Sequence, residues 1–279
     1  MIEHLQRDFA VKDLGALSYF LGIQATRHDG ALFLTQSKYV IDLLIRTKMD
    51  GVKPASTPCT TAGKLSRFDG DPLADPSEYH NIIGALQYCT LTCPDIAYSI
   101  NQLCQFLHSP TTVHMVAAKR VLRYLKGTLE FGLHYTRGSL QLNGYCNSDW
   151  ARSPNDQKST TGYGIYIGPC LISWAAKKQA VVAKSSTEAE YRSMALVVAK
   201  MYWLRMLFKE LRIPLLHTPC LWADNIGALS LSSNPIFHAC TKHIEVNYHF
   251  IREKVFNKDI IARYISIHDQ PSDIFTKGL

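Results

Sequence analysis

Residues 184–191 read KSSTEAEY and begin a long helical pattern. After Glu190, apolar side chains recur at helical spacing, at Met194, Val197, Met201, Leu204 and Phe208. Glu190 therefore starts the buried stripe of this helix, whereas Glu188 lies about 200° away and faces water. A buried, ionised carboxylate needs a metal ion or a paired charge. The alternative is a helix-capping role, because Ser185 with Glu188 and Thr187 with Glu190 both have capping-box spacing.

Three further carboxylates lie where predicted elements end. Asp149 follows the first strand of this half, Asp224 ends a strand before a short helix, and Asp273 lies in the first turn of a last helix. Singly, they are explained as a solvated strand-end charge, an N-cap and a helix-dipole partner. Together with Glu190, they occupy positions from which an α/β sheet can direct carboxylates into one crevice. Such a cluster would hold two divalent ions ~3.5–4 Å apart for phosphodiester chemistry.

The pattern around these residues predicts a mixed α/β domain with three strands, a helix, a strand, a helix, a strand and a last helix. Apolar and polar residues alternate over 140–147, which is typical of a strand. The other predicted strands and the long helix are at 161–167, 171–175, 219–223, 260–266 and 187–211.

The first half has a different pattern. A hairpin is predicted over 19–35 around Asp29-Gly30, followed by a helix with Ser37 as its N-cap. A proline-rich connection over 52–76 leads to helices at 77–92, 95–107 and 112–126, and a junction spans 128–140. We therefore predict units at 1–52, 53–135 and 136–279.

Composition limits the functional classes. The chain has 279 residues, is 47% hydrophobic and carries a formal charge of +7, which fits a globular protein and permits a polyanionic partner. It has no apolar run of about 18 residues and no secretion signal, so we expect no membrane span and no secretion. The eight irregularly spaced cysteines indicate reduced thiols and an intracellular location, in the cytoplasm or nucleus.

Several stretches together resemble the C-terminal part of a plant Copia-type retrotransposon Pol polyprotein. Those similar to the end of its reverse transcriptase palm are 9–15 and 19–23, and those similar to its thumb and connection are 84–98 and 119–128. The stretches similar to its ribonuclease H part are 184–191, 223–225, 241–250 and 273–277.

The resemblance implies a ribonuclease H-like fold, with a five-stranded mixed sheet flanked by helices. It implies cleavage of RNA in RNA–DNA hybrids, with four carboxylates holding two Mg²⁺ or Mn²⁺ ions. Three of these carry over onto Glu190, Asp224 and Asp273. The fourth does not, because the family reads Tyr-Cys-Asp-x-Asp-Trp-Ala where this chain has Asn147. An amide binds Mg²⁺ more weakly than a carboxylate, and Asp149 lies roughly 6–7 Å further along the same strand face.

The expected partners are an RNA–DNA hybrid or template–primer and the remainder of a Pol polyprotein. Lys119, Arg123 and Lys126 share one helix face that could contact phosphates, and Lys177-Lys178 follow the third strand. A solvated surface explains these cations equally well. The chain has no adjacent Asp-Asp pair, which the resemblance requires for polymerase activity, so we predict none.

Three functional hypotheses remain. The first is a metal-dependent ribonuclease H, and the second is a nucleic-acid-binding remnant that does not cleave. Asn147 separates the two, and because of it we expect little or no hybrid cleavage. Cys93, Cys240 and Asn247 also depart from the family pattern. The third and weakest hypothesis is a zinc module, built on pairs such as Cys89 with Cys93 or on His238, Cys240, His243 and His249.

Overall fold

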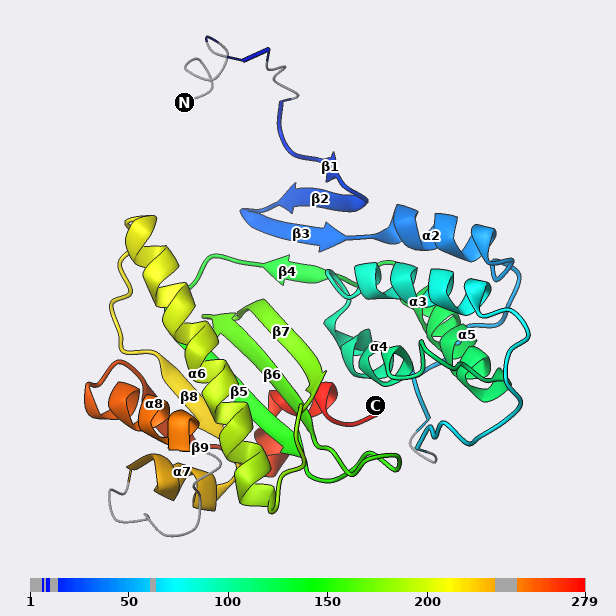
Figure 1. Ribbon diagram of the computed structural model, residues 1–279. Helices are drawn as coiled ribbons and strands as arrows, with labels where there is room; N and C mark the ends of the chain where they lie inside the picture. Colours follow the sequence, from blue (N-terminus) through cyan, green and yellow to red (C-terminus); the bar gives the residue numbers. More distant parts are fainter. Residues whose placement is uncertain (1–6, 8, 11–14, 61–63, 234–244, 279) are drawn as a thin grey trace.

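The computed structural model describes residues 7, 9–10, 15–60, 64–233 and 245–278 (Figure 1). Two hydrophobic clusters organise this part of the chain. One joins helices between residues 40 and 125, and the other joins a sheet and helices between residues 142 and 260. Within the described ranges, no helix combines the length and the apolar character that crossing a membrane requires.

A five-stranded mixed sheet forms the centre of the second half. The strands follow the order β7-β6-β5-β8-β9. The first three run antiparallel, and β5, β8 and β9 run parallel to one another. This confirms the five-stranded mixed sheet that the resemblance implies. The strands are β5 (Leu142–Asp149), β6 (Thr160–Ile167), β7 (Cys170–Lys178), β8 (Cys220–Ala223) and β9 (Ile261–Tyr264).

The long helix α6 (Ser186–Glu210) covers one face of this sheet. Its apolar stripe packs on β5 so closely that a Cβ at Gly144 would lie 2.5 Å from Met201 Sδ and 2.8 Å from Val197 Cγ1. Helices α7 (Ile226–Ser233) and α8 (Glu245–Phe256) pack beside α6.

The last segment of the chain packs against β5 and β6 through η4, a short 3₁₀ helix over Pro271–Phe275 that follows η3 (Ile267–Asp269). A Cβ at Gly162 of β6 would lie 2.6 Å from the Thr276 side chain and 2.7 Å from that of Phe275. Phe275 is fully buried. The expected last helix is therefore only a 3₁₀ turn, and its tight fit places Asp273 beside β5.

A second sheet of four antiparallel strands has the order β1-β2-β3-β4. The first three are β1 (Tyr19–Phe20), β2 (Ile23–His28) and β3 (Ala31–Thr35), and they include the predicted hairpin. The fourth, β4 (Leu133–Tyr135), lies in the expected junction and pairs with β3. This sheet joins residues on both sides of the boundary predicted at 52/53. The three-unit division itself stays a prediction.

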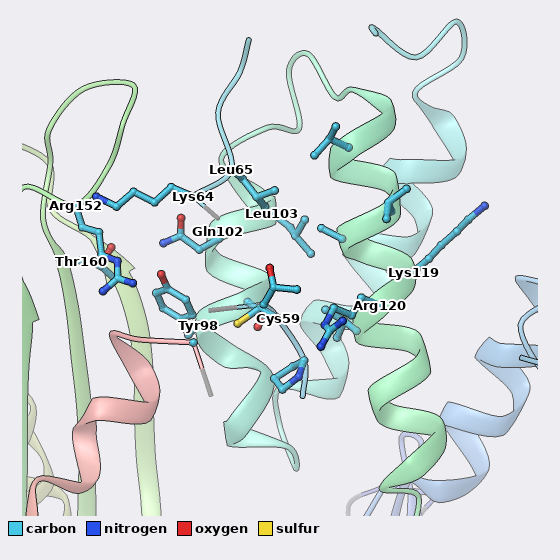
Figure 2. A pocket seen from close by; sticks show the side chains of 18 of the residues that line it. Cys59, Lys64, Leu65, Tyr98, Gln102, Leu103, Lys119, Arg120, Arg152 and Thr160 are labelled. Atoms are coloured by element: carbon cyan, nitrogen blue, oxygen red, sulfur yellow. The ribbon is translucent and has the colours of Figure 1, made fainter. Parts of the chain in front are cut away.

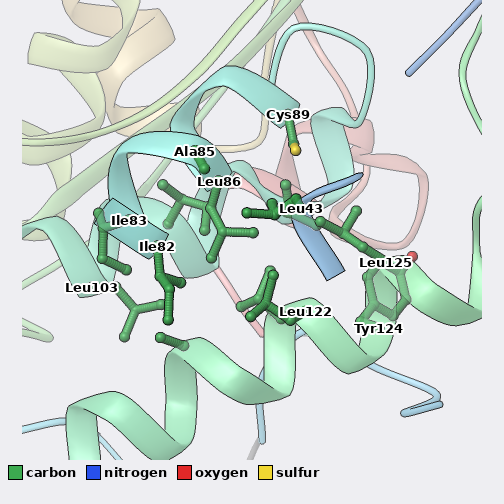
Figure 3. Packing of buried hydrophobic residues seen from close by; sticks show 14 of the residues in the cluster. Leu43, Ile82, Ile83, Ala85, Leu86, Cys89, Leu103, Leu122, Tyr124 and Leu125 are labelled. Carbon is green, nitrogen blue, oxygen red and sulfur yellow. The ribbon is translucent and has the colours of Figure 1, made fainter. Parts of the chain in front are cut away.

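The helices of the first half pack into one apolar cluster, in which Leu43, Leu86 and Leu122 meet (Figure 3). Ser37 is the first residue of α2 rather than its N-cap, and its hydroxyl donates to the Leu129 carbonyl at 2.6 Å. The helices are α2 (Ser37–Arg46), α3 (Ser77–Cys89), α4 (Ala97–Cys104) and α5 (Thr112–Gly127), with the 3₁₀ helix η1 (Pro94–Ile96) before α4.

We predict that Gly144→Ala lowers the free energy of unfolding by about 1–3 kcal/mol, because the added methyl group overpacks the contact between β5 and α6. Denaturant-induced unfolding measures it. Gly84→Ala is the matched control, because Gly84 lies within α3 and has nothing within 4 Å of an added Cβ. That change should raise the free energy of unfolding by about 0.5–1 kcal/mol. Equal effects from the two variants would contradict the packing described here.

Candidate functional site

Glu190 lies on the buried side of α6, as the apolar stripe predicts, and is only 5% exposed. Its Oε1 accepts a hydrogen bond from the Ser148 amide of β5 at 2.7 Å. Its Oε2 is buried and has no hydrogen-bond partner. The apolar stripe thus correctly predicted that this carboxylate is buried, and the structure shows that it contacts the central strand β5.

Glu188 has a different environment, although its side chain is only 12% exposed and does not face water as predicted. Its Oε1 accepts from Arg192 at 2.8 Å, and its Oε2 accepts from the Lys184 amide at 2.9 Å. The Ser185 hydroxyl accepts from the Glu188 amide and caps α6. The capping explanation thus applies to Ser185 and Glu188, and it does not account for Glu190.

Asp224 directly follows β8, the neighbour of β5. The capping role that could have explained it belongs to the next residue, since Asn225 Oδ1 accepts from the Ala228 amide at 2.9 Å. Asp224 is thus left available to the group around Glu190.

Asp273 lies in η4, and both of its carboxylate oxygens are hydrogen-bonded. The Asn147 amide nitrogen donates to Oδ1, and Lys277 Nζ donates to Oδ2 at 2.8 Å. The Asn147 amide nitrogen also lies 3.3 Å from the Thr276 hydroxyl. A carboxylate only accepts hydrogen bonds, so the amide must turn its nitrogen toward Asp273. Asn147, at the position where the resemblance implies a metal ligand, thus acts as a donor to Asp273.

Asp149 is directed elsewhere. It ends β5 and forms an ion pair with Arg152, whose Nε lies 3.1 Å from Asp149 Oδ2. It also lines a cavity that it shares with Tyr98 and Lys64. The structure therefore brings Asn147, Glu190, Asp224 and Asp273 into one region and leaves Asp149 beside it.

The electrostatics of this region are dominated by burial. Burial raises the pKa of the Glu190 carboxyl well above its usual range, and the Asp224 and Asp273 charges raise it further. Burial also raises the pKa of Asp224, and the Asp273 charge acts in the same direction. The positive charge of Lys277 lowers the pKa of both Glu190 and Asp224. Lys277 is therefore a cation within reach of all three carboxylates.

The residues present do not fit a two-ion centre. The unpartnered Glu190 Oε2 could accept a cation. However, Asn147 and Lys277 already satisfy both oxygens of Asp273. Within the described ranges, no three His, Cys, Asp or Glu side chains are placed to hold a metal ion. Ion binding would have to displace Lys277 or the Asn147 amide.

Lys277 and Gln270 were not singled out from the sequence, although both contribute here. The Gln270 amide donates to the Cys146 carbonyl of β5 at 3.0 Å. Lys277 lies inside the stretch 273–277, which resembles the family, and this was the one sequence feature that could have indicated its role. A lysine in such a motif is not recognised as a counter-ion until the fold places it beside the carboxylates.

The cations proposed to contact nucleic acid divide into two groups. Arg123 donates to the Lys53 carbonyl, and Lys126 donates to the Asp50 and Val52 carbonyls. Lys178 contacts Asp156, Gln105 and Ser153. Lys119 and Lys177 make no hydrogen bond or ion pair with the described residues. Three of the five cations therefore serve the fold, and two remain available for a phosphate.

Within the described ranges, the zinc candidates do not form a group of three ligands. His238, Cys240 and His243 lie outside the described residues, as does the side chain of Asn247. Cys89 and Cys93 are buried in the helical cluster. Burial raises the pKa of Cys89 to about 12 and that of Cys93 to about 11, which disfavours the thiolates that zinc requires.

No family model matches the chain. It is 46% identical, over 279 residues and 100% of its own length, to the retrovirus-related Pol polyprotein from transposon RE1 of Arabidopsis thaliana. The chain belongs to the family of retrovirus-related Pol polyproteins of transposons. It spans 19% of the length of the RE1 polyprotein.

Two other comparisons concern shorter proteins. The chain is 45% identical over 205 residues to the uncharacterized mitochondrial protein AtMg00810 of Arabidopsis thaliana, a match that covers 73% of this chain and 85% of that protein. Among solved structures, it is similar to LC11-RNase H1, isolated from compost by a metagenomic approach. That likeness has 9% identity and a TM-score of 0.38, and it covers 49% of this chain and 92% of that one.

We predict that Glu190→Gln stabilises this Pol polyprotein segment at pH 8 in the presence of EDTA, by about 1–3 kcal/mol, the usual cost of a buried polar group without a partner. Because folding raises the pKa of Glu190, its contribution favours the folded state in acid and is lost as pH rises through the folded pKa. Asp224 contributes with the same sign, so the variant should weaken the pH dependence without abolishing it.

Glu188→Gln is the matched control for this measurement. It loses an ion pair with Arg192 and should lower the free energy of unfolding by at most about 1 kcal/mol. Urea unfolding between pH 5 and pH 8 compares the two variants. Stabilisation by both, or by neither, would show that Glu190 is not an uncompensated buried carboxylate.

Proposed function

We propose that this chain is the ribonuclease H-like part of a Copia-type retroelement, together with the end of a reverse transcriptase, and that it binds RNA–DNA hybrids with little or no cleavage. The observation that carries the proposal is the hydrogen bond from the Asn147 amide to Asp273. That amide occupies the position where an active member of the family is expected to present a carboxylate to two Mg²⁺ or Mn²⁺ ions.

The charges in this region favour a non-cleaving domain over an active nuclease. Two dications need several carboxylates close together, because each carboxylate offsets the repulsion between the ions. Here one of the expected four is a neutral amide, and another, Asp273, is paired with Lys277. We therefore propose that divalent ions bind this region weakly and that the metal-dependent hydrolysis is lost.

The sequence and the described thiols support the remaining parts of the proposal. The chain has no adjacent Asp-Asp pair, so we propose that it does not extend primers. All cysteines within the described ranges are free thiols, which suits a protein acting in the cytoplasm or nucleus. The rest of a Pol polyprotein is the proposed partner chain.

The decisive test is cleavage of a labelled RNA–DNA hybrid with Mg²⁺ or Mn²⁺. We expect no cleavage by the unaltered chain and metal-dependent cleavage by Asn147→Asp, because the variant restores a negative charge at the end of β5. Each 1.4 kcal/mol recovered in the barrier is worth about tenfold in rate.

Asn143→Asp is the control, because it adds the same charge to the same strand at a residue that hydrogen-bonds Trp222 rather than Asp273. It should not produce cleavage. Robust metal-dependent cleavage by the unaltered chain would refute the proposal of a non-cleaving domain. An inactive Asn147→Asp would place further damage elsewhere, first at Cys240 and Asn247.

Hybrid binding should depend on salt through the two unengaged cations. Lys119→Gln and Lys177→Gln should each reduce the slope of log affinity against log salt by roughly one unit, because each removes one phosphate contact. Fluorescence anisotropy with a labelled hybrid, at several salt concentrations, measures the slope. Lys126→Gln is the control, since Lys126 donates to two backbone carbonyls, and it should affect stability rather than the slope. The same slope in all four proteins would remove these lysines from the interface.

A further inference from the structure

A cavity of about 550 Å³ lies between the helical half and the end of the central sheet (Figure 2). Helices α4 and α5 form one side, Cys59 and Lys64 contribute to the lining, and residues after β5 form the other side. This volume is within the usual range of small-molecule sites, roughly 300–1,000 Å³. None of the clustered carboxylates Glu190, Asp224 and Asp273 lines it, whereas Lys119 does.

The lining combines apolar walls with an excess of positive charge. Leu65, Leu103 and Val116 contribute apolar surface. Lys64 reaches across the cavity toward Arg152, and Arg120 approaches from the opposite side. The one acidic residue of the lining, Asp149, is already paired with Arg152. An anion entering the cavity therefore meets cations from three separate segments of the chain.

Three buried polar atoms of the described lining have no hydrogen-bond partner. They are Arg120 Nε, the hydroxyl of Ser99, a residue that is only 4% exposed, and Asp149 Oδ2, which is ion-paired with Arg152. The other side of the Arg120 guanidinium is held in place, because Nη2 donates to the Thr57 hydroxyl at 2.8 Å. A buried polar group without a partner is costly, but the Arg120 and Ser99 atoms are closed to solvent, so a ligand reaches them only if the wall of the cavity shifts.

The chemistry of the lining suits a ligand with an anionic end and a flat, polar-edged body. The Tyr98 ring and the Gln102 amide both lie inside the cavity (Figure 2). An aromatic ring stacks on a nucleobase, and a glutamine amide offers a donor and an acceptor to the edge of a base. Lysine and arginine suit a phosphate group.

We propose that this cavity binds a nucleotide, with its phosphate beside Lys64 and Arg152 and its base beside Tyr98 and Gln102, on the side toward Arg120. The nucleotide is either a free mononucleotide or the phosphorylated end of a strand, which present the same chemistry. The proposed nucleotide contacts are not residues of the proposed hybrid interface, although Lys119 of that interface also lines the cavity.

Isothermal titration of the full chain with adenosine monophosphate, adenosine and a 5′-phosphorylated tetranucleotide tests the proposal. Adenosine monophosphate should bind at least about tenfold more tightly than adenosine, because a hydrogen bond to a charged group is worth roughly 1.5–3 kcal/mol. Lys64→Gln should weaken binding of the phosphorylated ligand by about tenfold. Gln102→Leu should weaken binding without changing the preference for phosphate.

Lys209→Gln is the matched control, because it removes one exposed positive charge from α6, which contributes no residue to the cavity. It should leave binding unchanged. If only the tetranucleotide binds and Lys64→Gln weakens it, the bound nucleotide is a strand end. Equal affinity for adenosine and its phosphate, equal losses in Lys64→Gln and Lys209→Gln, or no binding of any probe at millimolar concentration would each overturn the proposal. Loss of hybrid binding with nucleotide binding intact would count against the proposed function alone.

Discussion

The hydrogen bond between Asn147 and Asp273 joins the central strand of the sheet to the last segment of the chain, and the arrangement of the site depends on it. Asp273 is fixed by this amide on one oxygen and by Lys277 on the other. Phe275, two residues further on, is buried against β6, where Gly162 leaves room for it. The backbone of β5 is held from both sides, because Ser148 donates to Glu190 and the Cys146 carbonyl accepts from Gln270. A neutral donor at position 147 therefore adds no further negative charge to a strand end that carboxylates from three elements approach.

The fold of the second half could be predicted because its sequence patterns are local and strong. Period-two alternation located β5, and the apolar stripe after Glu190 oriented α6 correctly. The type of the last element was not predicted correctly, because Pro271 and Asp273 are typical of the first turn of an α-helix. The chain instead forms a 3₁₀ turn, whose length is set by packing of Phe275 and Thr276 against Gly162. That contact joins residues more than a hundred positions apart, and no local pattern reports it.

The sequence predicted which carboxylates belong to the candidate site better than it predicted the hydrogen bonds and ion pairs among them. Sequence reasoning identified Glu190, Asp224 and Asp273, and the structure brings them to one region. It could not assign Lys277 to them, because a lysine four residues after an aspartate is equally common on a solvated surface. The basic helix face shows a further limit of sequence patterns. Arg123 and Lys126 have the spacing of phosphate ligands, but they donate to carbonyls of residues 50–53, which irregular backbone leaves without partners. Only the path of that segment, set by tertiary packing, distinguishes the two roles.

The amide at position 147 also changes what the region needs in order to fold. With aspartate there, four carboxylates would face one lysine, and each added like-charge pair at about 4 Å would cost on the order of 4 kcal/mol near a protein surface. Such a site would depend on divalent ions for its stability. With asparagine, one repulsive charge becomes a hydrogen-bond donor, and Lys277 compensates part of what remains. The exchange that removes a carboxylate from the ligand set implied by the resemblance thus also removes a repulsive charge from this end of the sheet. The loss of cleavage that we propose, with the fold retained, would follow from that single exchange of a charge for a hydrogen-bond donor.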